Sequence, residues 1–421
     1  MIPTLPGTRR IRLDTKSLAS VTSTDSQSEA DPRGVGLSGE AVDSIWDAAE
    51  ALYRTGVYPA MTLCLRRHGQ ILLNRSIGYA SGLSTQTAPG PDARLAEPDT
   101  PVCLFSASKA IIAVLIHKLA EEGGIDLDAP VSRYVPAFSG QGKSRTTISQ
   151  ALSHRGGFPY FIAGADDNDP QVLADWDECI RRICAQPADK TGHQMAYHAI
   201  TGGFILGEVI RRVTGMTVAE YLDSRLRKPM GMRYFTYGMD GRSRGRVAEN
   251  HVAGQPVRWP ISMWARKALS ADFNEVVEIS NQDFFMDAVI PAGNLYATAE
   301  ELSRFYQMLL NGGVYNGERI LKESTVARAV RPASGTGLDA ALKIPMRYSE
   351  GLMLGINPAG LYGPMCGAAY GHLGFMNILG WADPSRGLSV GLLTTGKSIV
   401  GGHLWPLARL LTTINWQCRT S

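Results

Sequence analysis

The most constraining feature of this sequence is a run of apolar residues at 110–116 that directly follows Ser106-Ala107-Ser108-Lys109. The run reads Ala-Ile-Ile-Ala-Val-Leu-Ile, and the predicted helix ends at Gly123-Gly124. A helix that is apolar on nearly all sides has to be buried between other elements. We therefore expect the helix 109–122 to lie inside the protein, with Ser106 and Lys109 at its entrance.

Ser106 and Lys109 are spaced so that their side chains can meet, because positions i and i+3 share a face of a helix. A partly desolvated amine has its charged form disfavoured, so Lys109 can act as a base toward the Ser106 hydroxyl. Unpaired N–H groups at the same helix start can help to bind an oxyanion. The alternative for an isolated Ser-x-x-Lys is a serine that caps the helix and a lysine in solvent.

The bulk composition is that of a globular protein and argues against nucleic acid and a membrane as partners. The 421 residues exceed what one hydrophobic core usually serves, so we expect two structural lobes. A net charge of +3 gives no reason to expect nucleic acid, and no apolar run of about 18 residues predicts a membrane span. The six cysteines lack metal-site spacing, and no signal-peptide pattern opens the chain. We expect reduced thiols, no metal ion and a cytoplasmic location.

The order of the predicted elements favours an α+β fold: an antiparallel sheet flanked by helices, plus a mainly helical lobe. An amphipathic helix from Ser38 to Gly56 precedes a hairpin of Pro59–Arg66 and Gln70–Ile77. Strand-like runs at Gly374–Ala382 and Leu388–Leu393 predict that the end of the chain rejoins this sheet. The predicted domains are a flexible N-terminal extension at 1–35, a sheet-containing domain at 36–135 and 285–421, and a helical domain at 136–284.

Residues 106–109 resemble the Ser-x-x-Lys motif of class C β-lactamases, penicillin-binding proteins and family VIII carboxylesterases. The stretch 119–131 resembles the helix end and loop that follow this motif in the family, and 148–157 is similar to its next segment. The resemblance covers most of the chain from about residue 40 onward. It implies a β-lactamase/transpeptidase-like fold and a serine hydrolase that forms an acyl-enzyme without a cofactor.

A second segment, Ala196–Phe204, resembles the tyrosine motif of the family, with Tyr197 in the place of the tyrosine. A phenol beside a lysinium has its anion favoured, so Tyr197 is expected to deprotonate Ser106 and later to protonate the leaving group. Without the resemblance, Tyr197 also suits a half-buried packing position. Ala199 stands where the lactamase pattern has asparagine, which weakens recognition of a β-lactam amide and favours esters.

A third segment, Tyr370–Phe375, aligns with the Lys-Thr-Gly motif of lactamases, with His372 in place of lysine. Gly374 would let the acyl group approach the strand, and the N–H of Phe375 is the expected oxyanion donor beside that of Ser106. His372 is a weaker and switchable positive charge, so recognition of a carboxylate should be reduced. The alternative is a core histidine that donates to a backbone carbonyl.

The sequence therefore predicts a carboxylesterase that acts on small-molecule esters with short to medium acyl chains. A β-lactamase, a D-amino acid peptidase and an acyltransferase with the same acyl-enzyme remain alternatives. Neither nucleic acid nor a membrane is an expected partner. Two further segments are interpreted as structural: the turn around His154, and Thr394-Thr395-Gly396-Lys397 at the end of the last predicted strand.

Overall fold

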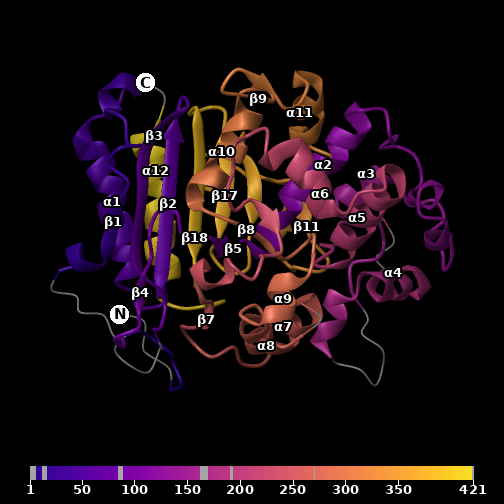
Figure 1. Ribbon diagram of the computed structural model, residues 1–421, viewed down its shortest axis with the longest axis horizontal. Coiled ribbons are helices and arrows are strands. Elements are labelled where there is room, and N and C mark those ends of the chain that lie inside the picture. The colour runs from indigo at the N-terminus through magenta and orange to yellow at the C-terminus, as the bar shows by residue number, and fades with distance from the viewer. Residues whose placement is uncertain are drawn as a thin grey trace.

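The computed structural model describes residues 6–11, 17–83, 89–161, 169–189, 193–269 and 271–419. Within these ranges eight strands form the main sheet (Figure 1), in the spatial order β1-β3-β2-β18-β17-β16-β13, with β4 also paired to β3. All of these pairings are antiparallel. The strands are β1 (Thr22–Thr24), β2 (Ala60–Arg67), β3 (Gln70–Ser81), β4 (Arg94–Leu95), β13 (Met353–Leu354), β16 (Tyr370–Leu373), β17 (Leu379–Asp383) and β18 (Leu388–Thr394).

The two ends of the chain meet at the centre of this sheet, where β2 pairs with β18. The register runs from Met61 opposite Thr394 to Arg67 opposite Leu388. Side chains alternate between the two faces of β2, as a pleated strand requires. Leu63 therefore belongs to the core on one face of the sheet, and its neighbour Cys64 belongs to the core on the other.

Helices cover both faces of the sheet, which confirms the predicted α+β class. On one face α1 (Gly39–Tyr53), capped by the Ser38 side chain, packs against α12 (Leu404–Gln417). On the other face α10 (Ala299–Leu310) lies across β2, β17 and β18, and α2 (Ser108–Glu121) lies beside β16. In α2 every residue from Ser108 to His117 is buried, as the all-round apolar pattern predicts.

The remaining helices lie mostly on the side of the molecule opposite α1 (Figure 1). They are α3 (Ile148–Leu152), α4 (Trp176–Ala185), α5 (Thr201–Thr214), α6 (Val218–Leu222), α7 (Ile261–Leu269), α8 (Phe273–Ile279), α9 (Asp283–Asp287) and α11 (Glu323–Val330). Helix α5 packs against α2 and thereby links this helical side to the buried helix at the centre. The division into the two predicted domains stays a prediction.

Short strands complete the structure. In the described residues β8 pairs with β5 and β6, β7 pairs in parallel with β19, and three more antiparallel pairs stand alone. These strands are β5 (Val102–Cys103), β6 (Thr236–Tyr237), β7 (His251–Val252), β8 (Leu295–Ala297), β9 (Val314–Tyr315), β10 (Glu318–Arg319), β11 (Gly337–Leu338), β12 (Pro345–Met346), β14 (Ala359–Gly360), β15 (Gly363–Pro364) and β19 (Gly396–Lys397).

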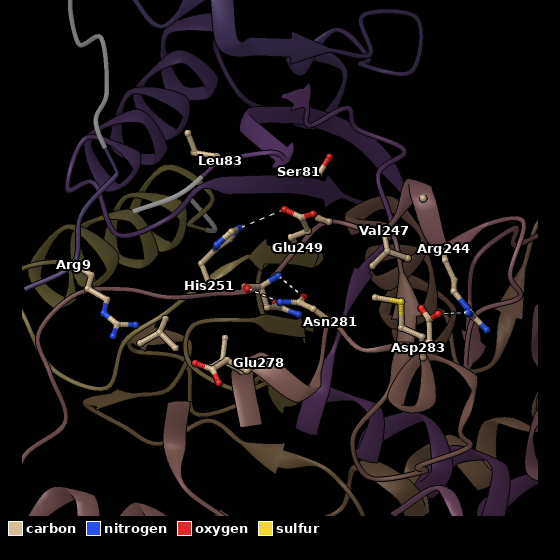
Figure 2. Close-up of a pocket in the computed structure, with 16 residues that line it drawn as sticks. Arg9, Ser81, Leu83, Arg244, Val247, Glu249, His251, Glu278, Asn281 and Asp283 are labelled. Atoms are coloured by element: carbon tan, nitrogen blue, oxygen red, sulfur yellow. Dashed lines mark hydrogen bonds and ion pairs between the residues drawn. The ribbon is translucent and has the colours of Figure 1, made fainter. Parts of the chain in front are cut away.

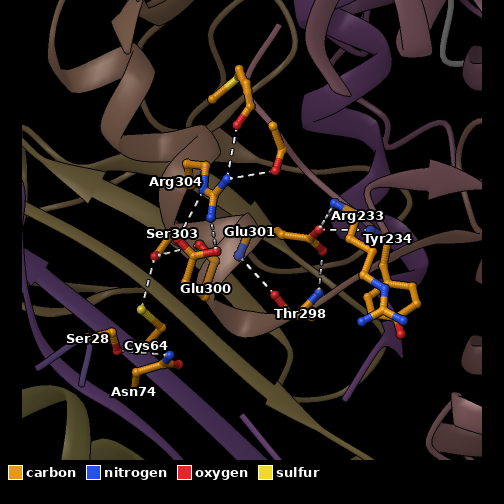
Figure 3. A network of polar contacts seen from close by, with 12 residues as sticks. Ser28, Cys64, Asn74, Arg233, Tyr234, Thr298, Glu300, Glu301, Ser303 and Arg304 are labelled. Carbon is orange, nitrogen blue, oxygen red and sulfur yellow. Dashed lines mark hydrogen bonds and ion pairs between the residues drawn. The ribbon is translucent and has the colours of Figure 1, made fainter. Parts of the chain in front are cut away.

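A polar network fixes the start of α10 between the sheet and the segment before β6 (Figure 3). Thr298 and Glu301 form a reciprocal capping box, and the Glu301 carboxylate also accepts the backbone N–H groups of Arg233 and Tyr234 at 2.5 and 2.8 Å. The neighbouring Glu300 pairs with Arg304 of the same helix. These bonds hold the helix that covers the centre of the sheet.

Two predictions about individual segments were wrong. Residues 1–35 do not form a free extension throughout, because β1 pairs with β3 and Glu29 binds the Arg75 guanidinium at 2.7 Å. The strand predicted at Gly374–Ala382 begins only at Leu379, because Gly374 donates to the carbonyl of Ile378 and closes a turn between β16 and β17. In the described part of the chain, no helix combines the length and apolar character needed to cross a membrane.

Candidate active site

Ser106 lies in a single 3₁₀ turn, Phe105–Ala107, at the entrance of α2. Phe105 has a φ of 46°, in the left-handed region that costs a non-glycine residue about 1–3 kcal/mol. Ser108 secures the turn, because its hydroxyl accepts the N–H of Leu295 in β8 at 3.0 Å. The Ser106 side chain is thus held at a strained, well-anchored corner and is partly exposed to a pocket.

Lys109 lies one turn further along and contacts Ser106 directly. Its Nζ donates to Ser106 Oγ at 3.0 Å and to the carbonyl of Ala292 at 2.9 Å. The side chain is buried, and the loss of hydration lowers the pKa of Lys109 well below its usual value. The amine is therefore driven toward the neutral form, whose lone pair can take the proton of the serine.

Tyr197 lies in the segment before α5 and is the third member of the group formed with Ser106 and Lys109. Lys109 Nζ lies 4.9 Å from the centre of the Tyr197 ring. Burial raises the pKa of Tyr197 above that of a free phenol, although the Ser106 side chain is close enough to lower the pKa of the hydroxyl. We expected a neighbouring lysinium to favour the phenolate and so to lower the pKa of Tyr197, and the pKa is raised instead. The reason is that burial favours the neutral form of both groups, the phenol of Tyr197 and the amine of Lys109.

His372 lies at the end of β16, and its side chain is buried. Its Nδ1–H donates to the carbonyl of Leu373 at 2.8 Å, so Nε2 is the unprotonated nitrogen. Burial lowers the pKa of His372 to about 3. His372 is therefore uncharged near pH 7. Its environment matches the alternative interpretation, a core histidine that donates to a backbone carbonyl.

Gly374 and Phe375 follow in the turn after β16. A Cβ atom at Gly374 would lie 2.5 Å from the carbonyl oxygen of Leu104, so only glycine fits this close approach. The Phe375 N–H donates to no backbone carbonyl among the described residues, and the ring packs against Phe105 with centroids 5.2 Å apart. Phe375 and Ser106 line the same pocket.

Sequence reasoning missed the residues that hold Tyr197 in place. The buried carboxylate of Asp339 accepts the N–H of Tyr197 at 3.2 Å and the hydroxyl of Tyr348 at 3.0 Å. The ring of His154 lies 4.7 Å from that of Tyr197, tilted by 53°, and its Nδ1 accepts the N–H of His198 at 3.2 Å. No local sequence pattern predicts the contact of Asp339 with Tyr197, because the two residues are 142 positions apart in the sequence.

A pocket of about 530 Å³ opens at Ser106 and has a mainly apolar wall. The apolar side chains in that wall are Phe105, Tyr160, Phe161, Val172, Leu173, Ile200, Leu269, Val276, Ile279, Phe285, Ile290 and Phe375. A larger cavity of about 630 Å³ lies elsewhere, lined by Arg9, Glu249 and His251 among others (Figure 2), and includes none of the predicted site residues. The geometry therefore assigns the candidate active site to the smaller, apolar pocket.

Comparison with known proteins places this arrangement in a family. The family model described as Beta-lactamase matches residues 46–412. The chain is 28% identical over 306 residues to "Esterase/beta-lactamase LipL" of Mycobacterium tuberculosis, covering 70% of this chain and 69% of that one. It is 27% identical over 379 residues to "Esterase EstB" of Burkholderia gladioli, covering 84% and 89%. A solved structure described as a family VIII carboxylesterase superposes with a TM-score of 0.75 at 25% identity, covering 91% of this chain and 99% of that one.

Proposed function

Because the chain belongs to the beta-lactamase family, we propose that it is a carboxylesterase that works through an acyl-enzyme on Ser106. The observation that carries the proposal is the contact of Lys109 Nζ with Ser106 Oγ at 3.0 Å, inside a site where burial favours the neutral amine. Tyr197, whose ring lies 4.9 Å from Lys109 Nζ and whose hydroxyl is influenced by Ser106, supplies the second proton-transfer group. The relatives named as esterases support the same reaction class.

In the proposed reaction, Ser106 Oγ attacks the ester carbonyl while its proton passes to Lys109. The N–H groups of Ser106 and Phe375 stabilise the oxyanion of the tetrahedral intermediate. Collapse of this intermediate breaks the bond to the leaving alcohol, which takes its proton from the Lys109–Tyr197 pair. Water then attacks the acyl carbon and passes a proton to the same pair. The bond between Ser106 Oγ and the acyl carbon breaks, Ser106 Oγ takes up that proton, and the carboxylic acid is released.

The preference for esters over β-lactams or D-amino acid peptides rests on two positions. Ala199 has no amide with which to bind a lactam side chain. Neutral His372 offers no cation for the carboxylate of a lactam or a peptide. A wall of mostly apolar side chains around about 530 Å³ suits a short to medium acyl chain. Transfer of the acyl group to an alcohol or amine would use the same intermediate and is the second candidate.

The six cysteines are buried and unpaired, which supports the proposal of a reducing, cytoplasmic location. The substrate in this proposal is a small molecule, with neither nucleic acid nor a membrane as partner. The small net charge of +3 supports the exclusion of nucleic acid as a partner.

The test is burst kinetics with p-nitrophenyl butyrate, run beside nitrocefin, on the wild type and on Ser106→Ala. We expect ester turnover that Ser106→Ala abolishes, with little cleavage of nitrocefin. Fast cleavage of nitrocefin would reassign the protein as a lactamase, and ester cleavage undiminished in Ser106→Ala would exclude the mechanism. A burst followed by slow turnover that added alcohols accelerate would favour the acyltransferase.

A further inference from the structure

A second, polar cavity of about 380 Å³ is lined in part by α3 and by three arginines. It shares no lining residue with the pocket at Ser106. Ser149 and Gln150 of α3 contribute to it, and Arg155, Arg328 and Arg331 supply its positive charges. Glu350 is the one carboxylate among its described lining residues. Three arginines against one glutamate give these four lining residues a net charge of +2.

The negative charge of Glu350 is already engaged. Arg328 Nε donates to the Glu350 carboxylate at 2.9 Å, and the hydroxyl of Ser149 donates to it at 2.6 Å. Arg328 also reaches Asp128 at 3.2 Å. Arg328 and Glu350 therefore neutralise each other, which leaves the charges of the other two arginines uncompensated.

Arg155 and Arg331 make no ion pair within the described part of the chain. Arg155 Nε is shielded from water and has no hydrogen-bond partner there. A shielded donor without an acceptor destabilises the folded state, and more so when it is charged. Gln150 adds a further donor, because its Oε1 already accepts the N–H of Thr147 and leaves its NH₂ group available.

We propose that this cavity binds the phosphate or carboxylate group of a small organic molecule, with Arg155 and Arg331 as the charged contacts. The planar guanidinium group matches an oxyanion with two parallel hydrogen bonds, and the charges of Arg155 and Arg331 have no counter-ion among the described residues. The cavity is larger than a single inorganic ion needs and lies within the range of small-molecule sites, about 300–1,000 Å³. The ligand class is therefore an organic phosphate or carboxylate.

The test is isothermal titration of the full chain with inorganic phosphate, phenyl phosphate and benzoate at low ionic strength. We expect saturable binding of at least one probe, weaker in added NaCl and weakened by about tenfold or more in Arg155→Gln and in Arg331→Gln. Comparison of the probes distinguishes a phosphate from a carboxylate site. Ester turnover is not part of the measurement, so its outcome is independent of the proposed catalytic reaction.

The matched control is Arg145→Gln, because Arg145 is exposed, makes no ion pair among the described residues and does not line the cavity. Binding should be unchanged in this variant, and Arg155→Lys, which keeps the charge, should retain part of the affinity. Thermal unfolding verifies that each variant is folded. The proposal would be overturned if none of the three probes bound saturably. It would also be overturned if Arg155→Gln kept the wild-type affinity, or if Arg145→Gln lowered the affinity as much as Arg155→Gln does.

Discussion

Lys397 Nζ lies 4.9 Å from the centre of the Phe105 ring, and Phe105 immediately precedes Ser106. Lys397 is fully buried in β19, and its ammonium group donates to the carbonyl of Thr394 at 2.6 Å. Burial lowers the pKa of Lys397 to about 7. Ser106, the proposed nucleophile, is therefore close to two buried lysines: Lys109, which contacts it directly, and Lys397, which contacts the residue before it.

The first prediction concerns the pH dependence of stability in Lys397→Met. Folded Lys397 loses its proton near pH 7, whereas an unfolded lysine keeps it until about pH 10.5. The unfolded state binds more protons in this window, so the free energy of unfolding should rise with pH, by about 2 kcal/mol from pH 7 to 9. Urea unfolding of Lys397→Met should lose this rise. The same rise in Lys397→Met as in the wild type would contradict the prediction, and exposed Lys322→Met is the control.

The second prediction separates the basicity of Lys109 from its charge. Arginine stays protonated at all working pH values, so Lys109→Arg keeps the charge but removes the base. We expect kcat/KM for p-nitrophenyl butyrate to fall by about 10²–10⁴ in this variant and equally in Lys109→Met. Lys118→Arg, on the same helix but paired with Glu121, should retain full activity. An active Lys109→Arg would show that a fixed positive charge, and not a base, is required.

The third prediction tests the close approach at Gly374. A methyl group there would meet the carbonyl oxygen of Leu104 at 2.5 Å and the Cβ of Ile378 at 2.7 Å. Gly374→Ala should displace the Phe375 N–H, lower kcat by about 10²–10³ and destabilise the fold by about 1–3 kcal/mol. Gly140→Ala is the control, since its methyl group meets nothing within 4 Å. Normal kinetics in Gly374→Ala would show that this turn takes no part in the reaction.

The fourth prediction concerns acid sensitivity through His198. This histidine is fully buried, its Nε2 accepts the N–H of Phe158 at 3.3 Å, and burial lowers its pKa to about 3. Between pH 6.5 and 3 the unfolded state binds the extra proton, so stability should fall with falling pH, by up to about 1.4 kcal/mol per unit. Urea unfolding of His198→Gln should show a shallower loss across this window, whereas exposed His193→Gln should not. Parallel curves for the wild type and His198→Gln would refute this source of acid sensitivity.

Local signals in the sequence were sufficient to predict the helix that begins next to Ser106 and the hairpin of the main sheet. The apolar run after Lys109 predicted a helix at 109–122, and α2 runs from Ser108 to Glu121. The predicted hairpin of Pro59–Arg66 and Gln70–Ile77 likewise corresponds to β2 and β3. These features depend on residues that are neighbours in the sequence, so periodicity and turn chemistry find them.

Features that depend on distant packing could not be predicted in this way. The pKa shifts of Tyr197 and His372 follow from burial by elements far away in the sequence, so no local pattern could predict them. The apolar composition of 374–382 predicted one strand, although Met376 and Asn377 adopt positive φ values in a turn. The support from Asp339 to Tyr197 is likewise a long-range contact without a sequence signature.

The pairing of β2 with β18 has a consequence for how the chain folds during synthesis. Residues 60–67 leave the ribosome more than 300 residues before their partners at 388–394. Until then β2 has a free edge, which is a known route to misassembly. Helix α2, which begins next to Ser106, is likewise synthesised before β16 and β17. A nascent chain that stops before β16 would therefore carry Ser106 and Lys109 without Gly374 and Phe375, and would be inactive and prone to aggregation.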